Sequence, residues 1–296
     1  MHSKKNELYY HSMLLPGMIL IFIFSIIPMF GIIIAFQKFV PAKGIFGSPF
    51  VGLYNFKLLF TYPDVRQVIF NTVLIATIKI ILGIVVPVFF AILLNEVRSV
   101  AYKRTVQTIV YLPHFLSWVI LAVMFKNILS YTGMVNKIGS VFSAEPAMFL
   151  TANKWFRSVI VSTDVWKEFG YGAVIYIAAM TNINPNLYEA AEIDGANRWH
   201  KIKYVTLPSI KPTIILMATL ALGNVLNAGF EQIFTMYSPL VYESGDIIDT
   251  YVYRMGLEKM QYSFATAVGL FKSVVSFVLI VLAYKLADKF AGYSIF

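Results

Sequence analysis

The most constraining feature of the chain is a series of six apolar runs, each long enough to cross a lipid bilayer as a helix. The runs lie at 14–36, 68–94, 106–125, 159–180, 213–235 and 265–287. A helix needs about 20 consecutive apolar residues to span the hydrocarbon core. Several runs contain proline, which membrane helices tolerate when neighbouring groups satisfy the freed backbone. The sequence therefore predicts an all-α integral membrane protein with six transmembrane helices.

The composition favours a single membrane-embedded domain. Hydrophobic residues make up 58% of the 296 residues and charged residues only 13%, whereas about 25% is usual for a soluble domain. No stretch between the apolar runs is long enough to build a separate core. The first run is also longer than the apolar region of a signal peptide. We expect an N-terminal tail at 1–13, one transmembrane domain at 14–287 and a C-terminal tail at 288–296.

Several functional classes are excluded by what the sequence lacks. The chain has no Cys, so disulfides, thiolate metal sites and Cys nucleophiles are excluded. Its four His are far apart, and no metal-ligand spacing or paired-carboxylate motif is present. We therefore expect neither a metal site nor bond chemistry. The net charge of +9 is more typical of contact with anionic lipid headgroups than with nucleic acid.

One polar stretch, residues 181–212, separates the fourth and fifth runs. Asn184 is a good N-cap and Pro185 suits a first helical turn, which predicts a helix over 186–193. Gly195 can end it in a left-handed C-cap. A second short helix is expected at about 196–205, ended by two prolines that start the next span, Pro208 and Pro212.

This stretch resembles the EAA-type motif of ABC-importer permeases, and we call it the EAA loop. The string YEAAEIDGANRWHKIKYVTLP is similar to the carbohydrate-uptake branch, with Ile202 in place of the usual Phe. The resemblance implies a type I permease architecture, with a coupling helix between helices 4 and 5 that docks on a separate ATPase. The residues that the resemblance assigns to coupling are Glu189, Ala190, Ala191, Asp194, Gly195, Leu207 and Pro208.

The resemblance also implies an orientation and a set of partners. If the EAA loop is cytoplasmic, so are both termini, in agreement with a slightly higher Lys/Arg density on that side. The chain has no G-x-x-x-x-G-K-[ST] phosphate loop, so no cofactor is expected in it, and ATP and magnesium belong to partner subunits. The expected partners are a second homologous permease (a heterodimer), two ATPase subunits and an extracellular solute-binding protein, all at the bacterial cytoplasmic membrane and without nucleic acid.

Charged residues within the fourth run are the first candidates for a substrate pathway. Asp164, Lys167 and Glu168 share one helix face at i, i+3 and i+4, and Tyr171 follows them. One interpretation is that they pair with each other, or with Lys79 and Lys272 from other runs, to hold helices together. The other is that they line a polar cavity facing outward.

A second group of candidates lies in the fifth run. Asn227, Glu231 and Phe234 recur at i, i+4 and i+7, with Gln232 beside them. Amides, carboxylates and aromatic rings suit a sugar, although helix packing or a membrane-interface belt is the more common role of such aromatics. The string NAGFEQIF and the residues after it resemble a subgroup of permeases for complex oligosaccharides, some of them containing uronic acids. The substrate class that the resemblance implies is oligosaccharides, including acidic ones.

Other functions remain open at this point. Within the ABC-importer class, the substrate could instead be an amino acid or phosphate. A secondary transporter driven by H⁺ or Na⁺ would use Asp164, Glu168, Glu231 and His114 as an ion relay. The EAA loop, the short six-helix length and the absence of an internal repeat argue against it.

Overall fold

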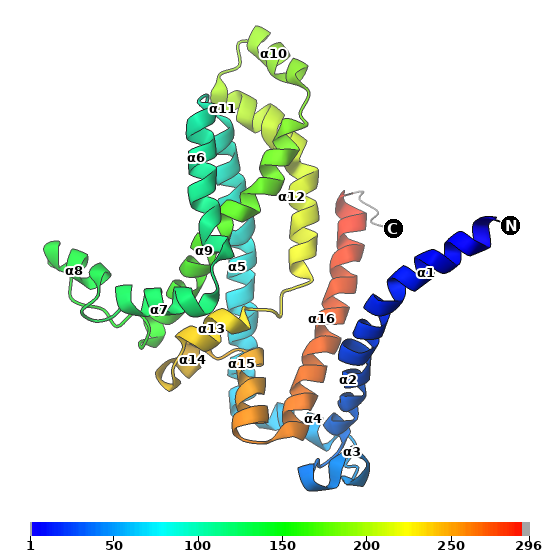
Figure 1. Ribbon diagram of the computed structural model, residues 1–296. Helices are drawn as coiled ribbons and strands as arrows, with labels where there is room; N and C mark the ends of the chain where they lie inside the picture. Colours follow the sequence, from blue (N-terminus) through cyan, green and yellow to red (C-terminus); the bar gives the residue numbers. More distant parts are fainter. Residues whose placement is uncertain (1, 292–296) are drawn as a thin grey trace. The chain divides into compact units, whose positions relative to one another are not determined.

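The computed structural model describes residues 2–291, which form helices joined by short loops (Figure 1). The helices are α1 (His2–Ile21), α2 (Ile27–Met29), α3 (Gly44–Gly47), α4 (Tyr54–Thr61), α5 (Pro63–Asn95), α6 (Val100–Tyr111), α7 (Trp118–Ile128), α8 (Met134–Val141), α9 (Asn153–Thr181), α10 (Pro185–Ile193), α11 (Arg198–Lys201), α12 (Leu207–Leu222), α13 (Phe230–Met236), α14 (Tyr242–Gly245), α15 (Ile248–Tyr253) and α16 (Tyr262–Ala291). The end of the predicted C-terminal tail, 292–296, lies outside the described residues.

The chain divides into two compact units. The first comprises residues 1–65 and 251–273, and the second comprises 66–250 and 274–296. Three helices, α5, α15 and α16, continue from one unit into the other. Both functional regions predicted from sequence fall within the second unit.

In the first unit, the segment that follows the first apolar run packs against the start of α16. The backbone N–H of Phe39 donates to Ser263 Oγ at 2.9 Å, and the Phe39 ring meets Tyr262 edge-on. Buried Asn55 donates to the carbonyls of Ala35 (2.8 Å) and Gln37 (3.0 Å), which closes the end of the first apolar segment.

In the second unit, α5, α9 and α12 enclose a core. One cluster of buried side chains includes Ala91, Ala173, Tyr176 and Ile210. Helix α6 lies against α9 where Gly170 is placed directly under the backbone of Val110; a Cβ at Gly170 would lie 2.2 Å from the Val110 carbonyl oxygen. Only glycine permits this close approach of two helices.

Among the described residues, four helical segments are long and apolar enough to cross a membrane. They are Tyr9–Phe36, Pro63–Asn95, Arg198–Leu222 and Tyr262–Lys285. A fifth is formed by Val100–Phe115 and Trp118–Ile128 if these count as one span, although they are bent by 102°. The predicted run at 106–125 is therefore broken at residues 116–117, where Ser117 caps a new helix by accepting from the N–H of Ile120.

The fifth predicted run, 213–235, is also interrupted. Helix α12 ends at Leu222, and α13 begins only at Phe230. Polar and glycine residues between them form turns, and Gly229 adopts φ +94°. A left-handed backbone is unfavourable for other residues and ends regular helix. Average hydropathy over the run conceals this break.

The expectation that Pro208 and Pro212 end the second helix of the EAA loop is wrong. The helix begins at Arg198 and continues through both prolines to Leu222. A wider π-helical turn, Ile202–Thr206, ends two residues before Pro208. Proline lacks an N–H and its ring crowds the carbonyl four residues earlier, and a π-turn relieves both conflicts. The same arrangement, Phe22–Ile26 before Pro28, occurs in the first segment.

Candidate functional site

The EAA loop forms a helical hairpin whose local structure confirms most of the prediction. Asn184 caps α10 by accepting from the N–H of Asn186 at 3.0 Å, and the helix ends at Ile193. Gly195 has φ +77° and thus the predicted left-handed conformation. Asn197 then caps α11 through the N–H of His200 at 2.9 Å. Each turn is therefore determined by a residue within the loop itself.

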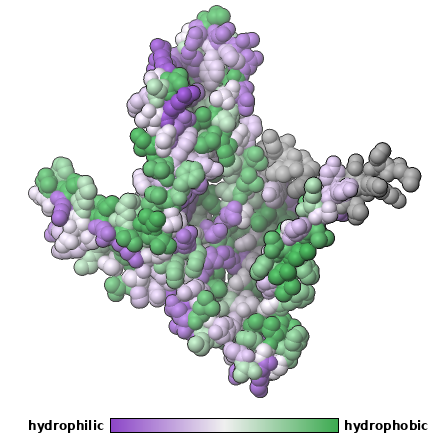
Figure 2. Space-filling model, in the orientation of Figure 1, coloured by the Kyte–Doolittle hydropathy of each residue, from purple (hydrophilic) through white to green (hydrophobic). Residues whose placement is uncertain are grey.

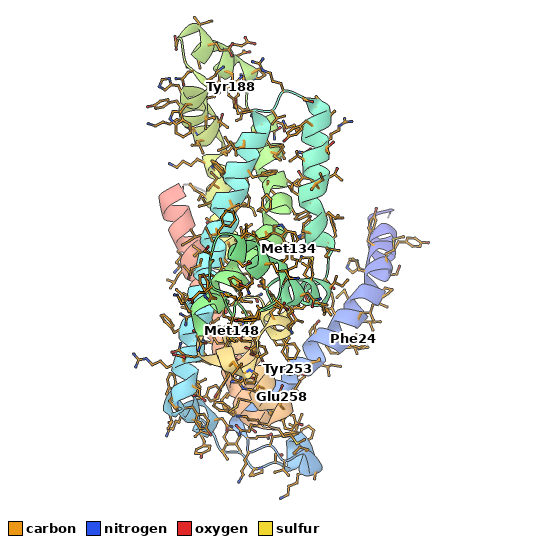
Figure 3. The ribbon with its side chains drawn as sticks, turned by 90° about the vertical axis from the view of Figure 1, so that its left-hand side faces the viewer. Phe24, Met134, Met148, Tyr188, Tyr253 and Glu258 are labelled. Atoms are coloured by element: carbon orange, nitrogen blue, oxygen red, sulfur yellow. The ribbon has the colours of Figure 1, made fainter. Side chains whose placement is uncertain are left out.

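Two side-chain contacts join α10 to the helix that follows it. The Tyr188 hydroxyl on α10 lies 2.9 Å from Thr206 Oγ1. Figure 3 shows Tyr188 between α10 and the helix that follows it. Lys201 Nζ forms an ion pair with Glu192. The hydrogen bond from Lys201 and its positive charge lower the pKa of the Glu192 carboxyl. The hairpin is thereby held as one piece, continuous with α12.

The hairpin projects from one end of the second unit, opposite α13 and α14 (Figure 1). Hydrophilic side chains gather over α10 and α11 in Figure 2. Several large apolar side chains are nevertheless exposed among them, including Ile193 (87%) and Trp199 (67%). Glu189 and Ala190 are exposed beside them, and Ala191 is half-buried. A surface that combines exposed apolar groups with a polar rim is typical of a protein–protein contact.

The remaining candidate residues of the loop have different surroundings. Asp194 and Gly195 are exposed at the turn, and a Cβ at Gly195 would meet nothing within 4 Å. Glycine is therefore needed there for its backbone conformation and not for space. Leu207 packs on the core cluster around Tyr176 and Ile210, and Pro208 is exposed.

A buried lysine, Lys79 of α5, lies at the centre of a second polar region. Its ammonium donates to Asp164 Oδ1 of α9 (2.9 Å), to the carbonyl of Ala228 (2.9 Å) and to Gln232 Oε1 of α13. All three ammonium protons thus have acceptors on separate segments. Lys79 holds the break between α12 and α13 against α5 and α9.

Gln232 completes this network from the other direction. Its amide nitrogen donates to the Ile160 carbonyl and to Thr163 Oγ1, both at 2.8 Å. Gly229 lies beside the lysine, and a Cβ there would be 2.9 Å from Lys79 Nζ. Gly229 was not singled out by sequence reasoning, although a glycine inside an apolar run, after two asparagines, is the signal that could have found it.

Lys167, Glu168 and Tyr171 form a separate group with His114. Lys167 Nζ bonds Glu168 Oε1 (2.9 Å) and the His114 carbonyl (2.7 Å). Glu168 Oε2 lies 2.6 Å from His114 Nδ1, and the His114 and Tyr171 rings stack at 3.9 Å. Asp164 and Lys167, one turn apart on α9, therefore join different networks. The pair between Asp164 and Lys79 agrees with the first of the two interpretations that the sequence left open, in which these charges hold helices together.

The four candidates of the fifth run do not share one helical face. Asn227 lies in the break, where its N–H bonds the Asn224 carbonyl at 2.8 Å, so its helical spacing to Glu231 is not realised. Glu231 is exposed on α13, while Gln232 is 1% exposed within the lysine network. Phe234 stacks on Phe230 with ring centroids 5.2 Å apart. Only Glu231 and Asn227 present polar groups away from the core.

Comparison with known proteins shows the family to which this chain is related. The family model of the "Binding-protein-dependent transport system inner membrane component" matches residues 83–292. The protein LplB of Bacillus subtilis (strain 168) is 40% identical over 100% of this chain and 93% of its own length. The polygalacturonan/rhamnogalacturonan transport system permease protein YteP of the same organism is 40% identical over 98% of this chain and 91% of its own length.

Solved structures match as closely. A chain in the crystal structure of a bacterial ABC transporter involved in the import of the acidic polysaccharide alginate superposes with a TM-score of 0.90, at 39% identity over 98% of both chains. A second crystal structure, of the alginate transporter with an alginate pentasaccharide-bound periplasmic protein, gives 0.89 at 38% identity over 97% of this chain and 96% of that one. This chain therefore belongs to the family of binding-protein-dependent transport system inner membrane components, and it is a permease with the ABC-importer fold.

Proposed function

We propose that this chain is one permease subunit of an ATP-driven importer that moves an oligosaccharide, acidic ones included, across the bacterial cytoplasmic membrane. ATP and magnesium bind on two separate ATPase subunits, so the chain itself needs no cofactor. A second homologous permease completes the membrane pathway as a heterodimer, and an extracellular binding protein delivers the substrate. The names of the relatives, which include a polygalacturonan permease and an alginate importer, support the substrate class.

The observation that carries this proposal is the EAA loop. It is held as one piece and exposes Ile193 and Trp199 beside Glu189. Its second helix continues without interruption to Leu222. A displacement of the loop by a partner would therefore move α12 along its whole length and reach the break at 223–229. Small residues Ala190 and Ala191 allow close approach of the partner, and the Glu189 carboxylate offers a contact for a basic group.

We further propose six spans with both termini cytoplasmic. Five come from the apolar segments and the bent pair, and α9 is the sixth. At 29 residues it is about 43 Å long, more than the hydrocarbon core of about 30 Å. Its charges have partners: Asp164 pairs with Lys79, and Lys167 with Glu168. Charges that are paired with one another are tolerated in membrane helices.

The test is to disable the loop without disturbing the membrane part. Glu189→Lys removes the carboxylate, and Gly195→Val places a β-branched residue at φ +77°. Both should abolish substrate uptake and the ATPase activity that loaded binding protein stimulates, while membrane insertion is unchanged. Glu258→Lys is a matched control, because it makes the same charge change at an exposed glutamate of the first unit (Figure 3). Full transport by both loop variants would refute the coupling role.

A further inference from the structure

A cavity of about 400 Å³ in the second unit lies outside both regions described above. Its polar and aromatic lining residues are Lys126, Ser130, Tyr131, Phe149, Thr151, Tyr237 and Ser238. This volume is within the usual range for ligand sites, about 300–1,000 Å³. The lining comes from the end of α7, the segments beside α8 and the residues that follow α13. The predicted topology places all of these segments on the outer side of the membrane.

The walls of this cavity are held in place by a buried asparagine. Asn136 Nδ2 donates to the carbonyls of Ser130 and Ala147, both at 3.0 Å. Its Oδ1 accepts from the N–H of Ala147 at 2.9 Å. The two stretches that contribute Tyr131 and Met148 (Figure 3) to the lining are therefore joined. Preorganised walls reduce the entropy that a ligand must overcome to bind.

One polar atom of the lining has an unused bonding capacity. The Ser238 Oγ is buried and has no hydrogen-bond partner among the described residues. A buried hydroxyl without a partner is uncommon in native structures and calls for a ligand or water at that position. The neighbouring Tyr237 ring is held between Phe234 and Tyr242, with ring centroids 6.1 Å and 5.2 Å away. Tyr237 thus presents a fixed aromatic surface beside the Ser238 hydroxyl.

The charge of the cavity is positive. Lys126 is exposed at the end of α7, and no ion pair of its ammonium occurs within the described part of the chain. Over the same residues, no carboxylate lines the cavity. Lys79 and Lys167 are both occupied by carboxylates. Of these three lysines, Lys126 alone is available to a substrate anion.

We infer that this cavity is an outer subsite for an anionic saccharide, with a uronate carboxylate on Lys126, sugar rings on Tyr131, Phe149 or Tyr237, and a sugar hydroxyl on Ser238. Hydroxyls and aromatic faces together suit sugar rings, and a lysine supplies a point charge for a carboxylate. The inference rests on the proposed function and names the place where that importer recognises acidic character.

A labelling experiment tests occupancy directly, because the chain has no natural Cys. Thr151→Cys places a thiol on an exposed residue of the lining. In the reconstituted importer, alginate pentasaccharide or a galacturonate pentasaccharide should slow maleimide labelling of this thiol at least fivefold. Ser140→Cys on α8 lies outside the lining and should label at the same rate with or without saccharide. Equal labelling of Thr151→Cys in both conditions overturns the subsite.

Uptake measurements separate the subsite from the proposed function. With binding protein saturated by a uronate pentasaccharide, Lys126→Gln should raise the importer's half-maximal concentration of loaded binding protein about fivefold or more. Lys126→Arg should keep this half-maximal concentration near the parent value. Lys137→Gln, which changes an exposed lysine on α8, should leave it equal to the parent value. An unchanged Lys126→Gln variant overturns the subsite while the importer function stands. Uptake of neutral but not uronate oligosaccharides overturns its anionic class, and no saccharide uptake at all refutes the proposed function.

Discussion

The EAA loop and the break between α12 and α13 are built from similar residues but are stabilised differently. Each interrupts the apolar helices with asparagines and a left-handed glycine, at φ +77° in Gly195 and +94° in Gly229. In the loop, asparagine caps within the same segment make the turns. In the break, the decisive contacts come from Lys79 on α5 and from α9. Turns in an exposed loop can be stabilised by caps within the loop itself, whereas a polar break among packed apolar helices needs donors from neighbouring helices.

The largest effect is expected from Lys79→Met, which removes the donor that holds the break. It leaves the half-buried Asp164 carboxylate without its cation and the Ala228 carbonyl without this donor. Breaking a buried ion pair by removing one partner costs about 3–5 kcal/mol. The apparent melting temperature of the purified permease in detergent should fall accordingly.

A matched comparison keeps this prediction specific. Lys79→Met combined with Asp164→Asn should recover part of the lost stability, because no uncompensated charge remains. Lys137→Met, on the exposed surface of α8, should leave the melting temperature within error of the parent. If the double variant melts below Lys79→Met alone, the ion pair is not the origin of the loss.

An intermediate effect is expected from alanine at the two left-handed glycines. Gly195→Ala meets open space and should cost only the backbone strain, about 1 kcal/mol. Gly229→Ala adds the same strain and displaces the Lys79 ammonium, 2.9 Å from the new Cβ, so about 2–3 kcal/mol is expected. Thermal unfolding of the two variants side by side measures the difference. Equal losses would mean that the lysine does not constrain the break.

The smallest effect concerns the ion pair between Glu192 and Lys201 in the EAA loop. The pKa of Glu192 is lowered in the folded loop by its bond to Lys201 and by the charge of that residue. A lowered carboxylate pKa contributes stability above the unfolded value, about 4.3 for a glutamate, and this contribution is lost as the pH falls through the folded pKa. Hydrogen exchange of the α10 amides, corrected for intrinsic rates, should therefore show less protection at acidic pH.

The corresponding Glu192→Gln variant removes the titrating group. It should show reduced protection of α10 already at neutral pH and no further loss on acidification through this range. Because Glu192 is exposed to solvent, the change should be confined to the hairpin and leave the membrane helices unaltered. A Glu192→Gln loop with the same pH response as the parent would assign the response to another group.

The sequence alone determined the helical membrane class, the caps at Asn184 and Gly195, and the position of the EAA loop. These features depend on hydropathy over about 20 residues or on the preference of a single residue for one backbone conformation. Such local terms are readable without knowing any neighbour. The α10 helix and its left-handed ending were predicted correctly for this reason.

Only the tertiary structure decided how the helices are interrupted and which polar groups meet. The break before Phe230 interrupts a run whose average hydropathy looks uniform. The π-turn before Pro208 lets the helix continue through a proline that was expected to end it. Lys79 is 85 residues from Asp164 and 153 from Gln232, so its partners depend on the packing of α5, α9 and α13. An apolar run predicts that a helix will lie in lipid, but the cost of leaving a buried polar group without a partner determines where that helix must end.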